Sequence, residues 1–134
     1  MRRHGSLLFA LSALAAGAAC HGSPNGPSRL AGGWTARGSG HTGLAYHLAI
    51  TPTGTTISGT ACAADGGITM FRNAPVTGRD RLVSFVVTAA AAGPCCAHLV
   101  GASFSGRQDG TGDIVGTLSN GADLRFTRGG SAGC

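Results

Sequence analysis

Short runs of alternating apolar and polar residues make up most of this chain from Leu30 onward. Clusters of Gly, Pro, Asn, Asp and Ser interrupt these runs about every dozen residues, as turns do in all-β sandwiches and barrels. No segment after the N-terminal apolar run has the 3.6-residue period of a helix. The pattern predicts eight strands, over residues 30–37, 43–51, 55–62, 67–76, 81–89, 97–105, 112–118 and 122–128.

The turns between these strands are rich in residues that adopt tight backbone conformations. We place them at residues 38–40, 52–54, 64–66, 78–80, 93–94, 106–110 and 120–121. The last is the pair Asn120-Gly121, which is favoured in type I′ hairpins because both central residues need a positive φ.

Each predicted strand has one apolar face, because successive side chains point to opposite sides of a sheet. In the fifth strand Leu82 has the opposite parity to its apolar neighbours, so the pattern is less regular there. We expect the inward positions to be Leu44, Tyr46, Leu48, Ile50, Val83, Phe85, Val87, Ile114, Gly116, Leu118, Leu124, Phe126 and Arg128.

Short connections favour an up-and-down meander, and closing the meander removes its exposed edges. The expected fold is therefore all-β, an eight-stranded antiparallel up-and-down β-barrel. Closure makes the first and last strands neighbours, which brings Trp34 and Arg128 to the same rim. A guanidinium packed on the indole there would close that end and contribute about 1 kcal/mol.

Gly32-Gly33-Trp34, with Arg128 at the end of the last strand, resembles the Gly-x-Trp motif and closing arginine of the calycin barrels. This group includes lipocalins, avidin-like proteins and small bacterial lipocalin-like domains. The resemblance covers residues 30–128 and implies a barrel closed at the Trp34 end and open at the other, with Gly32, Trp34 and Arg128 as closure residues. The other lipocalin motifs are missing and the strands are shorter, which argues against a large ligand cavity.

The N-terminus has the features of an export signal. Met1-Arg2-Arg3-His4 is basic, residues 7–19 form an apolar run, and Ala16-Gly17-Ala18 is a small-residue cleavage site. The run is shorter than the roughly 20 residues of a membrane-spanning helix. We therefore expect a signal peptide over residues 1–19, a flexible tether over 20–29, a barrel domain over 30–128 and a tail over 129–134.

Two cleavage alternatives stay open. Ala16-Gly17-Ala18 fits ordinary signal peptidase, whereas the segment ending at Cys20 resembles a bacterial lipoprotein signal with Cys20 as the acylated residue. It departs from that pattern at Gly17, where leucine is usual. The lipoprotein interpretation predicts a membrane anchor in the bacterial cell envelope, at the outer membrane or in the periplasm if the organism is Gram-negative.

The charge balance does not indicate a nucleic-acid partner. The whole chain is formally +5, and loss of Arg2 and Arg3 leaves eight arginines against five aspartates, a net charge of +3. Nucleic-acid binding needs a clustered basic patch or stripe. The chain has no lysine and no glutamate, which resembles the coding bias of a GC-rich genome, so arginine content carries no functional weight.

Three cysteines map to the expected open rim, and we expect a disulfide from Cys62 to Cys95 or Cys96. Such a bond closes a loop of about 33 residues and stabilises the domain by roughly 3–4 kcal/mol. For Cys134 three fates stay open: pairing with the spare rim cysteine, pairing with Cys20 if that residue is not acylated, or a free thiol. Acylation of Cys20 would leave four cysteines and three possible connectivities.

A rim metal site is the less favoured interpretation of the same region. Adjacent cysteines lack the Cys-x-x-Cys spacing that chelates one ion without strain, and oxidised cysteines are unable to act as ligands. We therefore expect no metal and no cofactor. The residues considered for such a site are His41, Cys62, Asp65, Cys95, Cys96 and His98.

The sequence does not indicate an enzyme. It has no Gly-x-Ser-x-Gly elbow, its five aspartates lie in or beside expected turns, and its glycine-rich segments precede strands rather than helices.

Two functional hypotheses remain. In the first, the barrel binds a small apolar ligand, with Tyr46 as the polar group. The candidate lining residues are Tyr46, Leu48, Phe85, Phe104 and Leu118. In the second, these side chains fill the barrel and the domain is an envelope structural or interaction module, since eight strands enclose space for little more than their own side chains.

Overall fold

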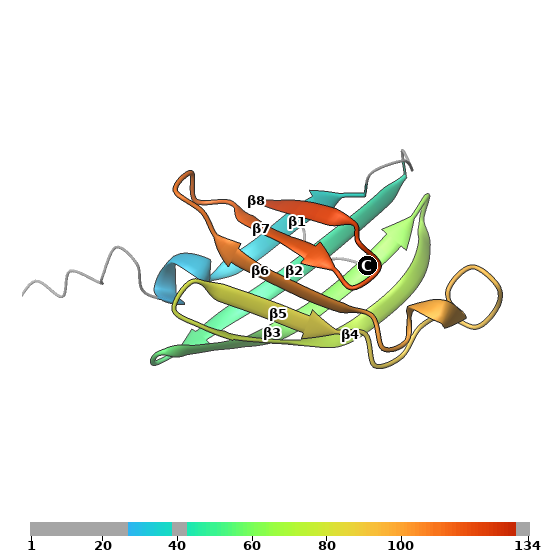
Figure 1. Cartoon of the computed structure of the whole chain (residues 1–134), viewed down its shortest axis with the longest axis horizontal. Coiled ribbons are helices and arrows are strands. Elements are labelled where there is room, and N and C mark those ends of the chain that lie inside the picture. Colours follow the sequence, from blue (N-terminus) through green and yellow to red (C-terminus); the bar gives the residue numbers. More distant parts are fainter. Residues whose placement is uncertain (1–26, 39–42, 131–134) are drawn as a thin grey trace, which may run out of the picture.

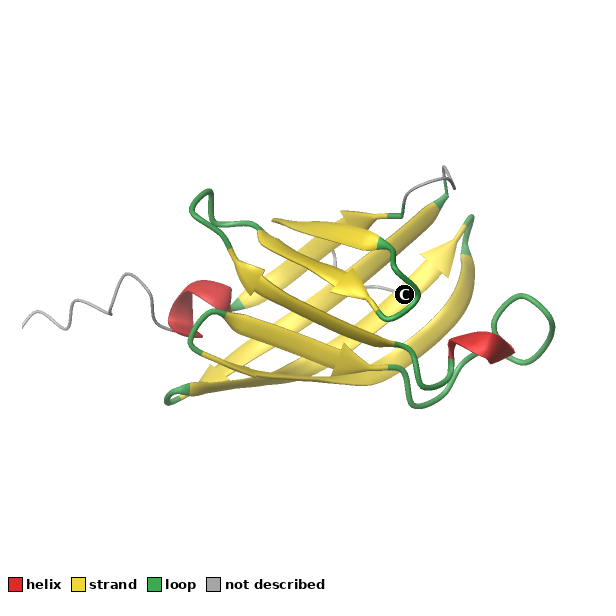
Figure 2. Cartoon of the chain, viewed as in Figure 1, coloured by secondary structure: helices red, strands yellow, loops and turns green. Residues whose placement is uncertain are grey.

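The computed structural model describes residues 27–38 and 43–130, which form one closed antiparallel barrel (Figure 1). The signal peptide, Cys20, His41 and Cys134 lie outside the described residues. Figure 2 shows that strands form the barrel wall and that two short helical turns lie at its two ends. The 3₁₀ turns are η1 (Pro27–Leu30) and η2 (Ala97–Leu99). The strands are β1 (Gly32–Arg37), β2 (Leu44–Thr53), β3 (Thr56–Asp65), β4 (Ile68–Arg79), β5 (Leu82–Val86), β6 (Ser103–Gln108), β7 (Ile114–Leu118) and β8 (Asp123–Arg128).

Each strand pairs with its neighbour in sequence, and β1 pairs with β8 to close the barrel. The predicted all-β fold, strand number and up-and-down connectivity are confirmed. In the seam Trp34 lies opposite Arg128 and Thr35 lies opposite Thr127. Within the described residues, no helix is long and apolar enough to cross a membrane.

Alternation fixes which side chains form the core. Along β2, the residues Leu44, Tyr46, Leu48 and Ile50 are all buried, while those between them are partly exposed. The same parity buries Val83, Phe85 and Val87, and it leaves Leu82 55% exposed. The expected inward faces are therefore correct for β2 and β5. Arg128 differs from Leu124 and Phe126 in being exposed, because it lies at the end of β8.

The start of β1 and the end of β8 meet at the closed end of the barrel. Here η1 places Leu30 in the core with no exposed surface. The indole Nε1 of Trp34 donates a hydrogen bond of 2.9 Å to the Leu30 carbonyl oxygen. Above the indole lies the Arg128 guanidinium, whose Nη1 donates to the Ala31 carbonyl at 2.6 Å and whose Nη2 donates to the Arg29 carbonyl.

A ladder of aromatic rings fills the middle of the barrel. Centroid distances are 6.4 Å from Tyr46 to Phe71, 6.1 Å from Phe71 to Phe85, and 5.2 Å from Phe85 to Phe104. Phe104 meets Phe126 edge to face at 5.4 Å. Pairs in these offset and edge arrangements contribute about 0.5–1.5 kcal/mol each beyond their buried area.

The expected sixth strand was wrong at its start. Residues 97–99 form η2 instead, because the Leu99 amide donates to the Cys96 carbonyl and the Val100 amide donates to the Ala97 carbonyl, directly after a turn closed on the Gly93 carbonyl. β6 begins only at Ser103 and continues to Gln108, through part of the segment expected to be a turn. The turn lies at 109–113, where Asp109 Oδ1 accepts from the amides of Thr111 and Asp113.

Two other local features differ from the expectations. The hairpin at Asn120-Gly121 is present, but only Gly121 has a positive φ, of 92°, so the turn is not type I′. In β4 the register against β3 shifts between Ala74 and Phe71, with Asn73 at a φ of 57°. This bulge keeps both Ala74 and Phe71 buried although they are three residues apart.

Candidate ligand-binding site at the open end of the barrel

The end opposite η1 is hollow. A cavity of about 740 Å³ opens there between the β3–β4 turn, the segment from β5 to β6 and the β7–β8 turn. In Figure 1 this end lies to the right, beside η2. These connections were all expected at the open rim. The lining residues are Gly38, Leu44, Tyr46, Asp65, Gly66, Ile68, Met70, Cys95, Cys96, His98, Leu99, Asn120, Ala122 and Leu124.

The cavity reaches two layers of inward side chains into the barrel. On β2 it is lined by Leu44 and Tyr46 but not by Leu48, the next inward residue. On β8 it is lined by Leu124 but not by Phe126. Below this depth the aromatic ladder occupies the barrel axis, with the Phe85 and Phe104 rings stacked at 5.2 Å.

The five predicted lining residues therefore separate into two groups. Tyr46 lines the cavity. Leu48, Phe85 and Phe104 lie below it, with exposed fractions of 0%, 2% and 1%, and Leu118 is 5% exposed without lining it. The structure thus packs most of the predicted set against one another in the filled part of the barrel.

Apolar side chains form most of the cavity surface, and polar groups lie around them. Asp65, His98 and Asn120 come from three different connections at the rim. Sequence reasoning did not name Met70, Leu99 or Leu124 as lining residues. The inward parity of Leu124 at the open end of β8 could have identified it, whereas Leu99 lies in η2, which has no strand alternation.

Tyr46 supplies the one hydroxyl on the described cavity surface. Burial raises its pKa above 10.0, so the phenol keeps its proton at neutral pH. Among the described residues the hydroxyl has no hydrogen-bond partner, and no side-chain oxygen or nitrogen there is both fully buried and unpaired. The Tyr46 oxygen is therefore accessible from the cavity and can donate a hydrogen bond to a bound molecule.

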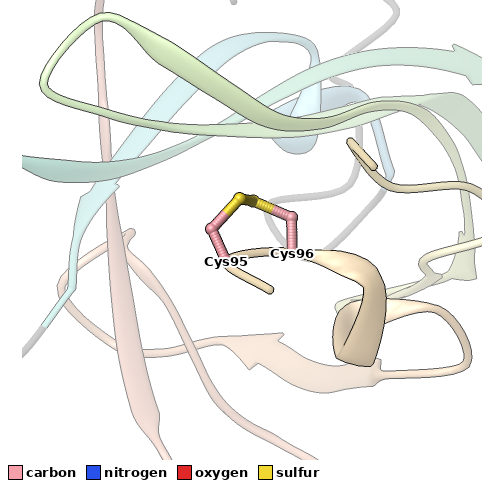
Figure 3. The surroundings of a disulfide bond; sticks show 2 residues. All are labelled: Cys95 and Cys96. Atoms are coloured by element: carbon pink, nitrogen blue, oxygen red, sulfur yellow. A yellow bond between two sulfur atoms is a disulfide. The ribbon is translucent and has the colours of Figure 1, made fainter. Parts of the chain in front are cut away.

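The segment between β5 and β6 covers one side of the mouth. Its base is held by paired backbone hydrogen bonds between Val87 and residues 101–102, and by a bond from the Ala91 amide to the Met70 carbonyl. Cys96 is fully buried under this segment, whereas Cys95 is exposed. Figure 3 shows the two adjacent residues joined as a disulfide. Their sulfur atoms are 2.11 Å apart.

This pairing differs from the expected bridge between Cys62 and one of the two adjacent cysteines. The reason is strand parity. Ala61 and Ala63 are buried inside the barrel, so Cys62 between them points to the outer face, opposite His47 of β2. Cys96 instead lies inside the mouth. The expectation placed Cys62 correctly towards the upper part of β3 but took no account of the wall between the two sulfurs.

The described residues hold no cluster of three or more His, Cys, Asp or Glu side chains that could bind a metal ion. At the closed end, Arg125 bridges Asp109 and Asp113 with N–O distances of 3.1 and 2.8 Å. These groups support the β6–β7 turn on the outer surface and do not face the cavity.

Comparison of the chain with protein-family models, curated proteins and solved structures found no match. The closed eight-stranded antiparallel barrel, with Arg128 on Trp34, is consistent with a calycin-like fold. Function is therefore inferred from the geometry of this site.

Proposed function

We propose that this protein is an exported, lipid-anchored barrel that binds a small apolar molecule at its open end. The observation that supports the proposal best is the cavity of about 740 Å³ above the aromatic ladder. Pockets for small molecules usually enclose about 300–1,000 Å³, with mainly apolar walls and a few polar groups. The cavity falls within this range and has that composition.

The lining indicates what kind of molecule fits. Leu44, Met70 and Leu124 offer apolar surface, while the protonated Tyr46 hydroxyl offers a hydrogen-bond donor within the cavity. An apolar molecule with one acceptor oxygen would satisfy both. Polar or charged substituents would be placed towards the rim, near Asp65 and His98.

The anchor is proposed from the sequence. Because η1 begins at Pro27, acylation of Cys20 would leave residues 20–26 as a tether before the domain, a span of up to about 25 Å. The tether joins the barrel at η1, which lies at the closed end. The ligand would then enter at the end farther from the anchor.

A second candidate function is an envelope interaction module without a ligand. It is favoured by the filled lower barrel and by two exposed apolar side chains near the mouth, Ile68 at 66% and Val100 at 53%. In that case a partner protein would cover the rim, and no small molecule would enter.

Binding can be tested with N-phenyl-1-naphthylamine, an apolar dye that becomes fluorescent in apolar surroundings. We expect saturable binding to the folded wild-type domain and a loss of at least tenfold in affinity for Leu99→Glu, which places a charge in the mouth. Leu82→Glu is the matched control, because Leu82 is 55% exposed on β5 and does not line the cavity. Absence of saturable binding to folded wild-type protein would refute the ligand hypothesis.

The anchor needs a separate measurement. Intact mass spectrometry of protein purified from its own membranes, before and after denaturation, distinguishes covalent lipid from bound ligand. A lipid-sized increment that persists after denaturation and lies on Cys20 is expected. A bare polypeptide beginning near Ala19 would exclude acylation and leave the ligand proposal standing.

A further inference from the structure

We propose that Cys62 forms a disulfide with Cys134, which fastens the C-terminal tail across the outer face of β1, β2 and β3. The proposal does not depend on ligand binding. It concerns the barrel wall rather than its interior, and it follows from the positions of three outward residues and from the direction in which the chain leaves β8.

The three outward residues form one row across the wall. Thr35 of β1 lies opposite His47 of β2, and His47 lies opposite Cys62 of β3. All three point outward because their strand neighbours are buried. The hydroxyl of Thr35 is 3.3 Å from Nδ1 of His47, so the first two side chains of the row are in contact.

The end of the chain turns onto this row. The Gly129 amide donates to the Gly33 carbonyl at 3.1 Å, and the Thr35 hydroxyl donates to the Gly129 carbonyl at 2.9 Å. A Cβ added to Gly130 would lie 2.3 Å from the Thr35 hydroxyl oxygen, so this glycine passes closely over the outer face of β1. The chain has therefore left the β8 strand path and lies against β1.

The distance to Cys62 is within reach of the tail. Two strand spacings separate β1 from β3, or about 10 Å in total. The four residues from Gly130 to Cys134 span up to about 13 Å when extended. A tail that ran along the row from Thr35 past His47 would bring Cys134 to Cys62.

The cysteine chemistry supports the same pair. Cys62 is disulfide-bonded, and Cys95 and Cys96 are bonded to each other. The remaining cysteines are Cys20 and Cys134. Cys20 is seven residues before η1, at the closed end, whereas Cys134 is four residues from a glycine already on the row. A shorter connection gives the higher effective concentration of the second thiol.

Formation of the bond requires an oxidant. The oxidant in this proposal is a disulfide of another protein in an oxidising compartment. The two thiols lose two protons and two electrons and form one S–S bond. The disulfide of the other protein accepts the two protons and two electrons and becomes a dithiol. The product links β3 to the segment after β8, so a covalent connection crosses the β1–β8 seam. Cys20 stays available for acylation.

Trypsin separates the cysteines cleanly, because the chain has arginine but no lysine. Cys62 falls in peptide 38–72, Cys95 and Cys96 fall in peptide 82–107, and Cys134 falls in the peptide that begins at Gly129. Cys20 falls in the peptide that ends at Arg29. The full mature chain is alkylated without reduction, digested and analysed by mass spectrometry.

We expect a linked species containing peptide 38–72 and the peptide from Gly129, which disappears on reduction. The Cys95→Ser/Cys96→Ser variant should retain this species. Cys134→Ser should lose it and yield an alkylated Cys62. Linkage of Cys62 to the Cys20 peptide or to peptide 82–107, or alkylation of Cys62 in the wild-type chain, would overturn the proposal.

Discussion

The guanidinium carbon of Arg128 lies 4.3 Å from the centre of the Trp34 ring, and the two residues also face each other across the seam between β8 and β1. The same guanidinium donates to the carbonyls of Ala31 and Arg29. One side chain thus joins the last strand, the first strand and the turn η1.

Arg128→Ala should lower the free energy of unfolding by about 1–2 kcal/mol, because it removes the cation–π contact and two charge-assisted hydrogen bonds. Urea denaturation followed by fluorescence measures it, since Trp34 is the only tryptophan. The control is Arg37→Ala, an exposed arginine at the end of β1, for which we expect a change within about 0.5 kcal/mol. Equal effects of the two variants would contradict the closing role of Arg128.

Phe85→Ala should cost about 3–5 kcal/mol, because its ring is 2% exposed and stacks on Phe104. Val86→Ala is the control, since Val86 is the next residue and points outward with 44% exposure. The measurement is the urea midpoint together with the slope of the transition. If Phe85→Ala lost less than about 1 kcal/mol, the middle of the barrel would not be packed as described.

Gly106 and Gly116 face each other across β6 and β7, and the ring of Phe104 lies over both. A Cβ on Gly106 would lie 2.5 Å from the Phe104 ring, and one on Gly116 would lie 2.2 Å from the Ser105 carbonyl oxygen. Each Gly→Ala variant should therefore destabilise the barrel by about 1–3 kcal/mol. Thermal unfolding compares them with Gly110→Ala, whose Cβ would meet no atom within 4 Å. A similar loss in all three would refute this steric explanation.

Tyr46 is the only tyrosine, so its ionisation can be followed directly by the near-ultraviolet absorbance of the phenolate. Burial raises its pKa above 10.0. The unfolded chain releases this proton at lower pH than the native protein does, so stability should fall as the pH rises above 10.0. Tyr46→Phe should abolish the absorbance change and this part of the stability loss. Titration at or below 10.0 in the folded protein would contradict the burial.

The Asp109 carboxyl should give the stability of the folded protein a pH dependence opposite in sign to that of Tyr46. Its pKa lies below 3.8, first because the Thr111 hydroxyl donates to it and also because Arg125 pairs with it. Its stabilising contribution should be present above pH 3.8 and lost as the pH falls through the native pKa. The difference in urea midpoint between wild type and Asp109→Asn should shrink on acidification. Thr111→Val should reduce this pH dependence, and an unchanged profile would argue against the Thr111 contribution.

Much of the fold could be predicted from the sequence, because the alternation of inward and outward side chains depends only on neighbouring residues of the same strand. The inward faces of β2 and β5, and the approach of Trp34 to Arg128, follow from parity and from barrel closure. The segment before β6 could not be predicted, because Ala97–Leu99 forms a turn through backbone bonds to the Cys96 and Ala97 carbonyls, and no hydrophobic period marks those bonds.

The site was less predictable than the fold. Parity correctly pointed Leu48, Phe85 and Phe104 inward, but it does not say at which height the packed interior ends and the cavity begins. That height depends on the bulge at Asn73, which places Phe71 into the ladder between Tyr46 and Phe85. The predicted partner of Cys62 was wrong for a related reason, since its height along β3 was assigned correctly but the face of the wall to which it points was not.

The division of the barrel into a packed lower part and a hollow upper part has an evolutionary consequence. Core residues such as Phe85 and Trp34 do not line the cavity, and cavity residues near the mouth, such as Leu99 and Met70, are only partly buried. Substitutions at the mouth can therefore accumulate without the loss of core packing that a shared set would impose. A scaffold of this kind can acquire new binding preferences one residue at a time while remaining folded at every step.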